Sequence, residues 1–264
     1  MKRAASATAV LLFVFGLAVA GCKKEPPPPK KPLKVAAAAD LSHAFTDVAE
    51  AYRTKTGQEV KLSFGATGLL EKQIAEGAPF DVFAAANVSF VDDAVKAGAC
   101  FADTKSTYAF GHLVVWAKKG SPVPAQLADL ADPAYAKIAI ANPDHAPYGK
   151  AAKQALERAG VWDKVSSRIV YGENVQQTLA FAESGNAEVA LVALSLAIGG
   201  EGVYAEIGGH DPLEQSLVVC KGEGQDASPD GKAFAAFVAS PEGRAIMRRY
   251  GFLLPGETIG DAGK

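Results

Sequence analysis

One stretch of the chain, residues 60–74, changes its hydrophobic period halfway along. Its first half alternates apolar and polar residues, as in a half-buried strand, and from Leu69 onward the apolar residues recur at helical spacing. The turn between the two patterns is Gly65-Ala-Thr-Gly68, which places Thr67 at the expected helix N-cap. A helix start exposes unpaired N–H groups and a partial positive charge, so this stretch is typical of an anion seat. An ordinary strand-to-helix turn has the same pattern.

The same strand-turn-helix order recurs along the chain. We expect a strand at 33–40 with a helix at 41–52, a strand at 77–86 with a helix at 89–97, a strand at 137–141 with a helix at 150–159, and a strand at 169–171 with a helix at 176–184. This alternation favours an α/β fold. In open α/β sheets, ligands lie beyond the carboxyl ends of the strands, so the turns of these units are the candidate binding site.

The N-terminal 32 residues have a different character. Residues 1–21 combine two early basic residues, an apolar run and a small-residue end before Cys22, which predicts a lipoprotein signal peptide with lipidation of the Cys22 thiol. The apolar run is too short for a membrane-spanning helix. Residues 22–32 are rich in proline and lysine, which favours an extended linker. We therefore expect an extracytoplasmic protein, on the periplasmic or cell-surface side, anchored to a membrane through Cys22.

Charge and length limit the function of the rest of the chain. The whole sequence of 264 residues has a formal net charge of −2, yet residues 1–31 hold six of the 27 basic residues and only one of the 29 acidic residues. The remainder is therefore net acidic, which argues against nucleic-acid binding. Its length suits one large or two small α/β domains.

Two cysteines remain after lipidation is assigned to Cys22. Cys100 and Cys220 lie at the ends of apolar stretches, in a chain expected in an export compartment where disulfides form. A disulfide between them and two buried free thiols both remain open, because the sequence does not give their separation.

The sequence contains no recognisable catalytic constellation. Its four histidines show no metal-ligand spacing, and there is no Gly-x-Ser-x-Gly elbow and no phosphate-binding Gly-x-x-x-x-Gly-Lys motif. His145, in a loop with Asp144 and Pro147, is the best lone candidate for a catalytic residue, but a surface or loop-stabilising histidine is the favoured interpretation. We expect no enzyme, no cofactor and no metal-cation site. An α/β enzyme and a structural lipoprotein remain as alternatives.

Several motifs together resemble a known family. They are Ala37-Ala-Ala-Asp-Leu41, Ser63-Phe-Gly-Ala-Thr-Gly68, Gly77-Ala-Pro-Phe-Asp-Val-Phe83, Ala146-Pro-Tyr-Gly149, Gly172-Glu-Asn-Val175 and Gly185-Asn-Ala-Glu-Val-Ala-Leu-Val-Ala-Leu194. In this order the set resembles the periplasmic molybdate-binding proteins of ABC importers, over nearly all of the chain after residue 32. The resemblance implies a monomeric type II solute-binding protein that holds a molybdate or tungstate oxyanion and passes it to the permease of an importer.

The resemblance also implies a fold and a set of binding residues. The fold has two lobes, each a mixed sheet flanked by helices, with two crossing strands as the hinge. The β-rich runs placed to cross between the lobes here are Leu113–Ala117 and Ser216–Cys220. Residues 33–112 plus 214–264 would therefore form lobe I and residues 113–213 lobe II. Four loops would hold the oxyanion, mostly through backbone N–H groups. The residues that correspond to these loops here are Ala39, Asp40, Thr67, Tyr148 and Val175.

Asp40 departs from the pattern, because the family usually has Ser or Asn at this place. Molybdate and tungstate only accept hydrogen bonds at neutral pH, so a carboxylate directed at them would repel them. Asp40 could turn away and cap its helix, could be protonated, or could accept a hydrogen bond from a proton-bearing ligand of the phosphate or arsenate type. We expect the first, with molybdate or tungstate as the ligand and a phosphate-type oxyanion as the alternative.

Overall fold

The structure is a computed structural model that describes residues 30–257. The predicted signal peptide and the predicted lipidation site at Cys22 lie outside these residues, as does most of the proline-rich segment. The chain from Lys31 onward forms one structural unit. None of the helices between residues 30 and 257 has the length and hydrophobicity that crossing a bilayer requires.

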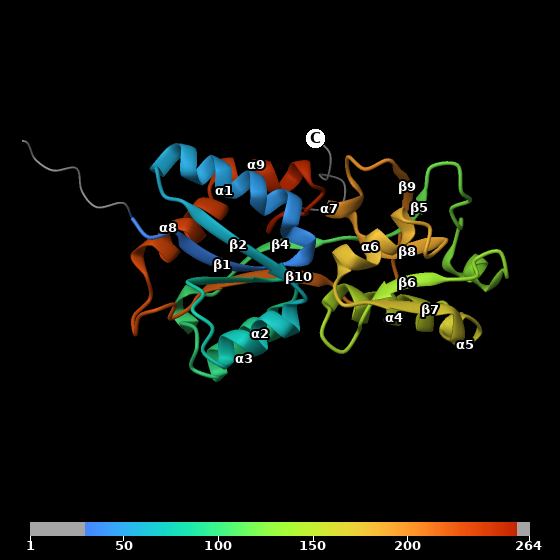
Figure 1. The fold of residues 1–264 in the computed structure, drawn as a ribbon, viewed down its shortest axis with the longest axis horizontal. Helices are drawn as coiled ribbons and strands as arrows, with labels where there is room; N and C mark the ends of the chain where they lie inside the picture. Colours follow the sequence, from blue (N-terminus) through green and yellow to red (C-terminus); the bar gives the residue numbers. More distant parts are fainter. Residues whose placement is uncertain (1–29, 258–264) are drawn as a thin grey trace, which may run out of the picture. The chain divides into compact units, whose positions relative to one another are not determined.

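A first five-stranded sheet has the order β2-β1-β3-β10-β4. β1 is parallel to β2 and β3, and β10 is antiparallel to β3 and β4. Helices α1, α8 and α9 cover one face, and α2 and α3 cover the other (Figure 1). The elements are β1 (Leu33–Ala38), β2 (Val60–Gly65), β3 (Val82–Ala85), β4 (Ser106–Gly111), β10 (Leu213–Val219), α1 (Ser42–Thr56), α2 (Thr67–Ala75), α3 (Val88–Lys96), α8 (Pro229–Val238) and α9 (Pro241–Arg249), with short 3₁₀ turns η1 (Ala39–Leu41) and η2 (Ala102–Thr104). We call this part lobe I.

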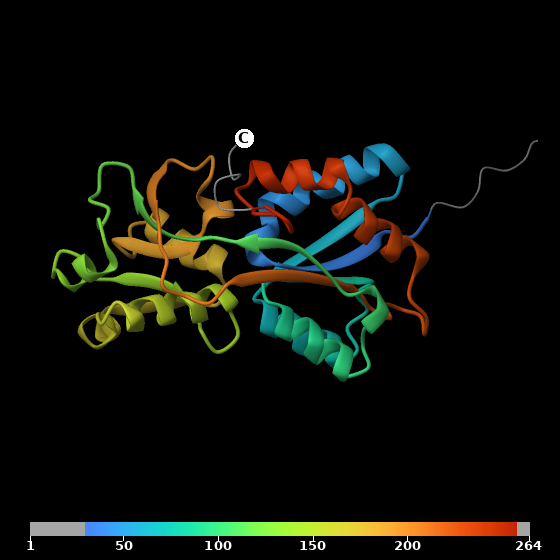
Figure 2. The ribbon, with the colours of Figure 1, turned by 180° about the vertical axis from the view of Figure 1, so that it is seen from behind.

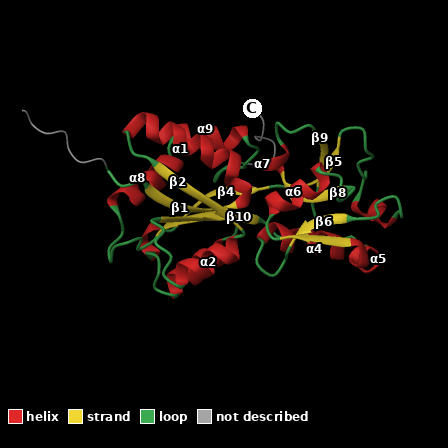
Figure 3. Cartoon of the chain, in the orientation of Figure 1, coloured by secondary structure: helices red, strands yellow, loops and turns green. Residues whose placement is uncertain are grey.

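A second five-stranded sheet, with the order β7-β6-β8-β5-β9, forms lobe II. β6 is parallel to β7 and β8, and β5 is antiparallel to β8 and β9. Helix α6 packs on one face and α4 on the other, so both sheets lie between helices (Figure 3). The elements are β5 (Leu113–Lys118), β6 (Ile138–Ala141), β7 (Ile169–Gly172), β8 (Val189–Ala193), β9 (Gly202–Glu206), α4 (Pro147–Arg158), α5 (Trp162–Val165), α6 (Val175–Glu183) and α7 (Leu194–Ala197), with 3₁₀ turns η3 (Leu127–Ala131) and η4 (Ser166–Arg168).

The predicted two-lobed α/β fold is confirmed by the two helix-flanked sheets. The central strands β3, β6 and β8 are buried along their whole length, as their continuous apolar sequences require in a sheet covered on both faces. The chain passes between the sheets twice, from β4 into β5 and from β9 into β10 (Figure 2). The two runs expected to cross, β5 and β10, each pair within one sheet.

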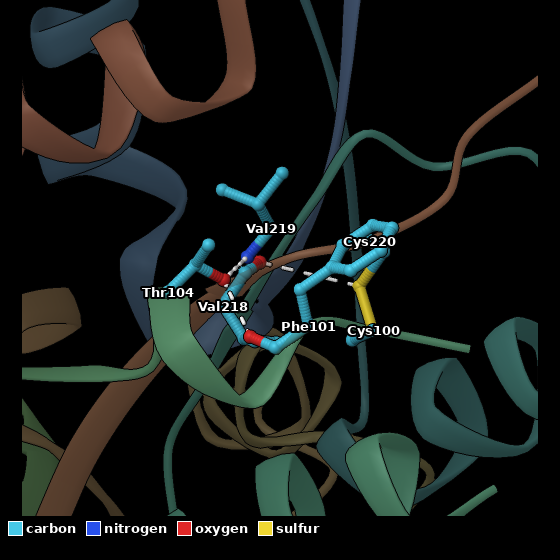
Figure 4. Close-up of a disulfide and its surroundings, with 6 residues drawn as sticks. All are labelled: Cys100, Phe101, Thr104, Val218, Val219 and Cys220. Carbon is cyan, nitrogen blue, oxygen red and sulfur yellow. Dashed lines mark hydrogen bonds between the residues drawn. A yellow bond between two sulfur atoms is a disulfide. The ribbon is translucent and has the colours of Figure 1, made fainter. Parts of the chain in front are cut away.

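A disulfide joins Cys100 and Cys220 in lobe I (Figure 4). Cys100 precedes β4 and Cys220 follows β10, and the two residues form an isolated antiparallel bridge. Phe101 N–H donates to the carbonyl of Val219 over 2.9 Å, and Val219 N–H donates to the hydroxyl of Thr104 over 3.0 Å. Of the two states left open by the sequence, the structure therefore contains the bonded one, which links segments 120 residues apart.

Candidate functional site

The carboxyl ends of the parallel strands of both sheets converge on one small cavity. Its volume is about 10 Å³, far below the roughly 300–1,000 Å³ of sites for drug-sized ligands. It therefore fits a small ion or molecule. The lining residues come from the turns after β1, β2, β3, β6 and β7, and they are Ala38, Ala39, Asp40, Gly65, Ala66, Thr67, Ala86, Ala146, Pro147, Tyr148, Asn174 and Val175.

All five residues predicted to bind the ligand lie around this cavity. Ala39 and Asp40 belong to η1 and Thr67 begins α2, all in lobe I. Tyr148 and Val175 lie in the first turns of α4 and α6 in lobe II. The structure thus brings together residues separated by more than 100 positions in the sequence, and their role in binding stays a prediction.

Three α-helices begin at the cavity wall. Their N-caps are Ala66 for α2, Ala146 for α4 and Asn174 for α6. Ala66 and Ala146 provide no side-chain cap, whereas the Asn174 side chain accepts from the N–H groups of Gln176 and Gln177. The first N–H groups of an α-helix have no partner inside the helix, and they carry the positive end of the helix dipole. The positive ends of three helix dipoles therefore lie at the cavity, which has no cationic side chain among its lining residues.

All three of these helix starts differ from the sequence prediction, and α6 begins at Val175, one residue before its predicted start. Helix α4 begins at Pro147, three residues before the predicted start, so Tyr148 lies in a helical turn and not in a loop. Proline at the first helical position explains the earlier start, because its ring fixes a helical φ and it lacks the N–H that would be unpaired there. Thr67 was predicted at the N-cap of α2, which is wrong by one residue: Ala66 has extended backbone angles and Thr67 is the first helical residue.

The Thr67 hydroxyl faces this cavity and is only 1% exposed. Its oxygen accepts a hydrogen bond from the N–H of Ala86 over 3.3 Å. No acceptor for its own hydrogen is found among residues 30–257. The hydroxyl therefore keeps one donor for a ligand that accepts hydrogen bonds.

Asp40 does not cap its helix, so the expectation that it turns away from the site is wrong. Neither η1 nor α1 has a side-chain cap, and the Asp40 side chain is 1% exposed and lines the cavity. Its Oδ2 accepts a hydrogen bond from Nε2 of Gln215 on β10. Its Oδ1 is buried and has no hydrogen-bond partner in the described part of the chain. The helix starts without this cap because the chain enters α1 through the 3₁₀ turn η1, which holds Asp40 inside the protein.

A buried polar network stands behind Asp40. The hydroxyl of Tyr108 on β4 donates to Oε1 of Gln215 over 2.8 Å, and Nε2 of Gln215 also lies 3.3 Å from the Tyr148 hydroxyl. Burial raises the pKa of Asp40 to about 6, while the hydrogen bond from Gln215 and the neighbouring Tyr148 hydroxyl act in the opposite direction. Burial, together with the nearby Asp40 carboxyl, also raises the pKa of both tyrosines. Gln215 and Tyr108 were not predicted as site residues. Both lie in strands, and the sequence of a strand does not show which of its buried polar residues contacts a turn elsewhere in the chain.

Besides the contact between Gln215 and Tyr148, two further hydrogen bonds join the lobes beside the cavity. The Ser195 hydroxyl of lobe II donates to the backbone carbonyl of Asp40 over 2.7 Å. The N–H of Gly68 in lobe I donates to the carbonyl of His145 over 2.9 Å. A Cβ on residue 68 would come within 3.0 Å of that carbonyl and 2.9 Å of the Phe90 ring, so only glycine allows this approach. The lobes are therefore closed over the cavity.

Residues 30–257 contain no group of three or more His, Cys, Asp or Glu side chains arranged to hold a metal ion. His145, the lone catalytic candidate, has its Nε2 2.9 Å from the carbonyl of Glu173, a contact that ties the loop before α4 to the turn after β7. This agrees with the loop-stabilising interpretation.

Comparison with known proteins gives consistent matches over nearly the same residues. Residues 33–253 match a family model described as bacterial extracellular solute-binding protein. The chain is 35% identical to the molybdate-binding protein ModA of Azotobacter vinelandii over 226 residues, which cover 83% of this chain and 89% of that protein. It is 34% identical to the molybdate-binding protein ModA of Rhodobacter capsulatus over 252 residues, 94% of this chain and 96% of that protein.

A solved structure gives the same result. The periplasmic molybdate-binding protein of Azotobacter vinelandii superposes with a TM-score of 0.76 at 30% sequence identity, and the match covers 84% of this chain and 99% of that chain.

Proposed function

The chain belongs to the bacterial extracellular solute-binding protein family, and from this we propose that it captures a tetrahedral oxyanion, most favourably molybdate or tungstate, and delivers it to an ABC importer. The observation that carries the proposal is the cavity between the lobes. Three helix N-termini and the free donor of Thr67 surround a small cavity that has no cationic side chain among its lining residues. Such a site binds an anion through backbone dipoles and hydrogen bonds.

The donors come from both lobes, which suits a protein that closes over its ligand. In this proposal the backbone N–H groups of Ala39, Asp40, Thr67, Tyr148 and Val175 hold the oxyanion together with the Thr67 hydroxyl. Residues 33–112 plus 214–264 and residues 113–213 move as the two lobes, and the contacts from Ser195 and Gly68 form on closure. The relatives named above as molybdate-binding proteins support this ligand class.

We infer the location of the protein from its family and from the sequence around Cys22. The family is extracellular, so the protein would act on the outer side of a cytoplasmic membrane, as a monomer that docks on an importer permease. The sequence around Cys22 supports a lipid anchor, with residues 22–32 as the tether.

Calorimetric titration tests the function directly. We expect molybdate and tungstate to bind with 1:1 stoichiometry at pH 7, and sulfate to bind more weakly. A protein that binds phosphate or arsenate but not molybdate would instead support the alternative of a proton-bearing ligand, which the buried carboxyl of Asp40 favours. A protein that binds none of these anions would refute oxyanion capture.

A further inference from the structure

Asp40 gives the anion site an acidic side chain that its ligand has to accommodate. The carboxyl is buried, lines the cavity and has one oxygen, Oδ1, without a protein partner among residues 30–257. A buried polar atom without a partner costs about 1–3 kcal/mol, more if it is charged. An unpartnered carboxyl oxygen on a residue that lines a ligand cavity therefore points to an interaction that the ligand completes.

The orientation of this carboxyl is fixed from behind. The Tyr108 hydroxyl donates to Oε1 of Gln215, which turns the amide so that its Nε2 faces Asp40 Oδ2. Since an amide nitrogen only donates, Oδ2 has to be an acceptor. Any proton on the carboxyl is thereby placed on Oδ1, the oxygen that is left for the ligand.

The other elements around Asp40 bring no compensating cation. The phenols of Tyr108 and Tyr148 are the titratable groups that interact with it, and no lysine, arginine or histidine of the described chain contributes to the shift of its pKa. η1 contacts α1, β2, α6 and α7. On α1, the nearest titratable residue is His43, and it is exposed. On β2 and α6, the charged residues Lys61 and Glu183 lie at the ends away from Asp40. Helix α7 has no titratable residue.

From this geometry we infer that Asp40 Oδ1 and the bound oxyanion share one proton, so that each molybdate or tungstate ion enters together with one proton from solvent. The proton forms an O–H bond on Oδ1 and is donated to an oxygen of the dianion, and no other covalent bond forms or breaks. Without that proton, a carboxylate and a dianion would face each other in a buried site. The inference rests on the proposed function and adds a pH dependence to it.

The size of the expected effect follows from the pKa of Asp40, which burial raises to about 6. At pH 8 about one protein molecule in a hundred carries the proton before binding, and the apparent affinity falls by that fraction. Between pH 6.5 and pH 8.5 we expect the affinity for molybdate to fall about ten-fold per pH unit. Titrations at pH 8 in buffers of different ionisation enthalpy should show the uptake of about one proton per molybdate bound.

Asp40→Asn is the matching variant. It keeps the size of the side chain, and Gln215 Nε2 still requires an acceptor on that side, so the new NH₂ group takes the place of Oδ1–H. We expect its molybdate affinity to be constant from pH 6.5 to pH 8.5, without proton uptake, and up to about 100-fold tighter than that of the wild type at pH 8. The control is Asp144→Asn, which removes the same charge from an exposed loop position and should keep the pH dependence of the wild type.

The outcomes separate the two proposals. Wild-type binding of molybdate without pH dependence or proton uptake overturns the shared proton and leaves oxyanion capture intact. An Asp40→Asn variant that keeps the ten-fold slope also overturns it, because the proton then belongs to another group. Failure of the wild type and of Asp40→Asn to bind molybdate or tungstate at any of these pH values refutes the proposed function. The number of protons taken up on molybdate binding is measured on the wild type alone. The shared proton can therefore be tested even if Asp40→Asn does not fold.

Discussion

Lobe I and lobe II have the same layout of helices around a mixed sheet, yet they meet the cavity with different chemistry. Lobe I contributes the side chains that can donate or exchange a proton, Thr67 and Asp40, with Gln215 behind them. Lobe II contributes two helix starts, whose backbone N–H groups donate whether or not the ligand carries a proton. It also contributes the Tyr148 phenol, which contacts Gln215. If the proposed function holds, we expect lobe I to select the ligand and lobe II to complete its enclosure.

The lobes also differ in covalent support, which gives the largest expected effect. Lobe I contains the Cys100–Cys220 disulfide, and the described part of lobe II contains none. Replacing both cysteines by serine should lower the free energy of unfolding by about 2–5 kcal/mol, because the bond closes a long loop in the unfolded chain. Urea denaturation of the oxidised wild type and the double variant measures this. Equal stability would show that the disulfide does not constrain the unfolded chain.

Asp40 should make the stability of lobe I depend on pH. Burial raises its pKa to about 6 from an ordinary value of 3.8, so the folded state holds a proton that the unfolded state has already released between these two values. The free energy of unfolding should then fall as pH rises from about 4 to about 6 and remain low above it. The loss is on the order of 2–3 kcal/mol.

Asp40→Asn should therefore be more stable than the wild type by about that amount at pH 8 and show no gain near pH 4. Urea denaturation of both proteins without ligand, at several pH values, gives the difference. A stability difference that does not vary with pH would show that the buried carboxyl keeps an ordinary pKa.

The Thr67 hydroxyl tests whether side chains of lobe I hold the ligand. Thr67→Val keeps the shape and removes one donor, which should weaken molybdate binding by about 1.5–3 kcal/mol, the range for a hydrogen bond to a charged group. The matched control in lobe II is Thr178→Val, because the Thr178 hydroxyl is buried and already donates to the carbonyl of Asn174 over 2.8 Å. Calorimetry should show weaker binding for the first variant only. Equal affinities would leave the Thr67 hydroxyl as an acceptor for Ala86 alone.

The smallest effect is expected for a contact between the lobes. Ser195→Ala removes the donor to the Asp40 carbonyl and should weaken molybdate binding by about 0.5–1.5 kcal/mol, mainly through faster dissociation, because the closed state loses one hydrogen bond. Stopped-flow measurement of association and dissociation rates distinguishes faster dissociation from slower association. A variant with unchanged dissociation would show that Ser195 does not contribute to closure.

Much of this site could be predicted from local sequence. The change of hydrophobic period at residues 60–74 indicated a strand that leads into a helix start, and the same order before Tyr148 and Val175 indicated further helix starts. Errors of one to three residues at the helix starts are explained by local geometry: the extended backbone of Ala66 and the proline at position 147. Edge strand β9 was missed, because its residues Val203 and Tyr204 are exposed and give no clear alternation.

The sequence by itself determined the order of the strand-turn-helix units and placed their turns to within a few residues, because hydrophobic period, glycine and proline act locally. The tertiary structure alone decided what Asp40 does. A capping role and a buried role are both compatible with the sequence around residue 40, since aspartate is common at helix starts. The choice depends on Gln215, 175 positions away on β10, and on Tyr108, which sets the orientation of its amide. Those contacts exist only once β10 has paired between β3 and β4.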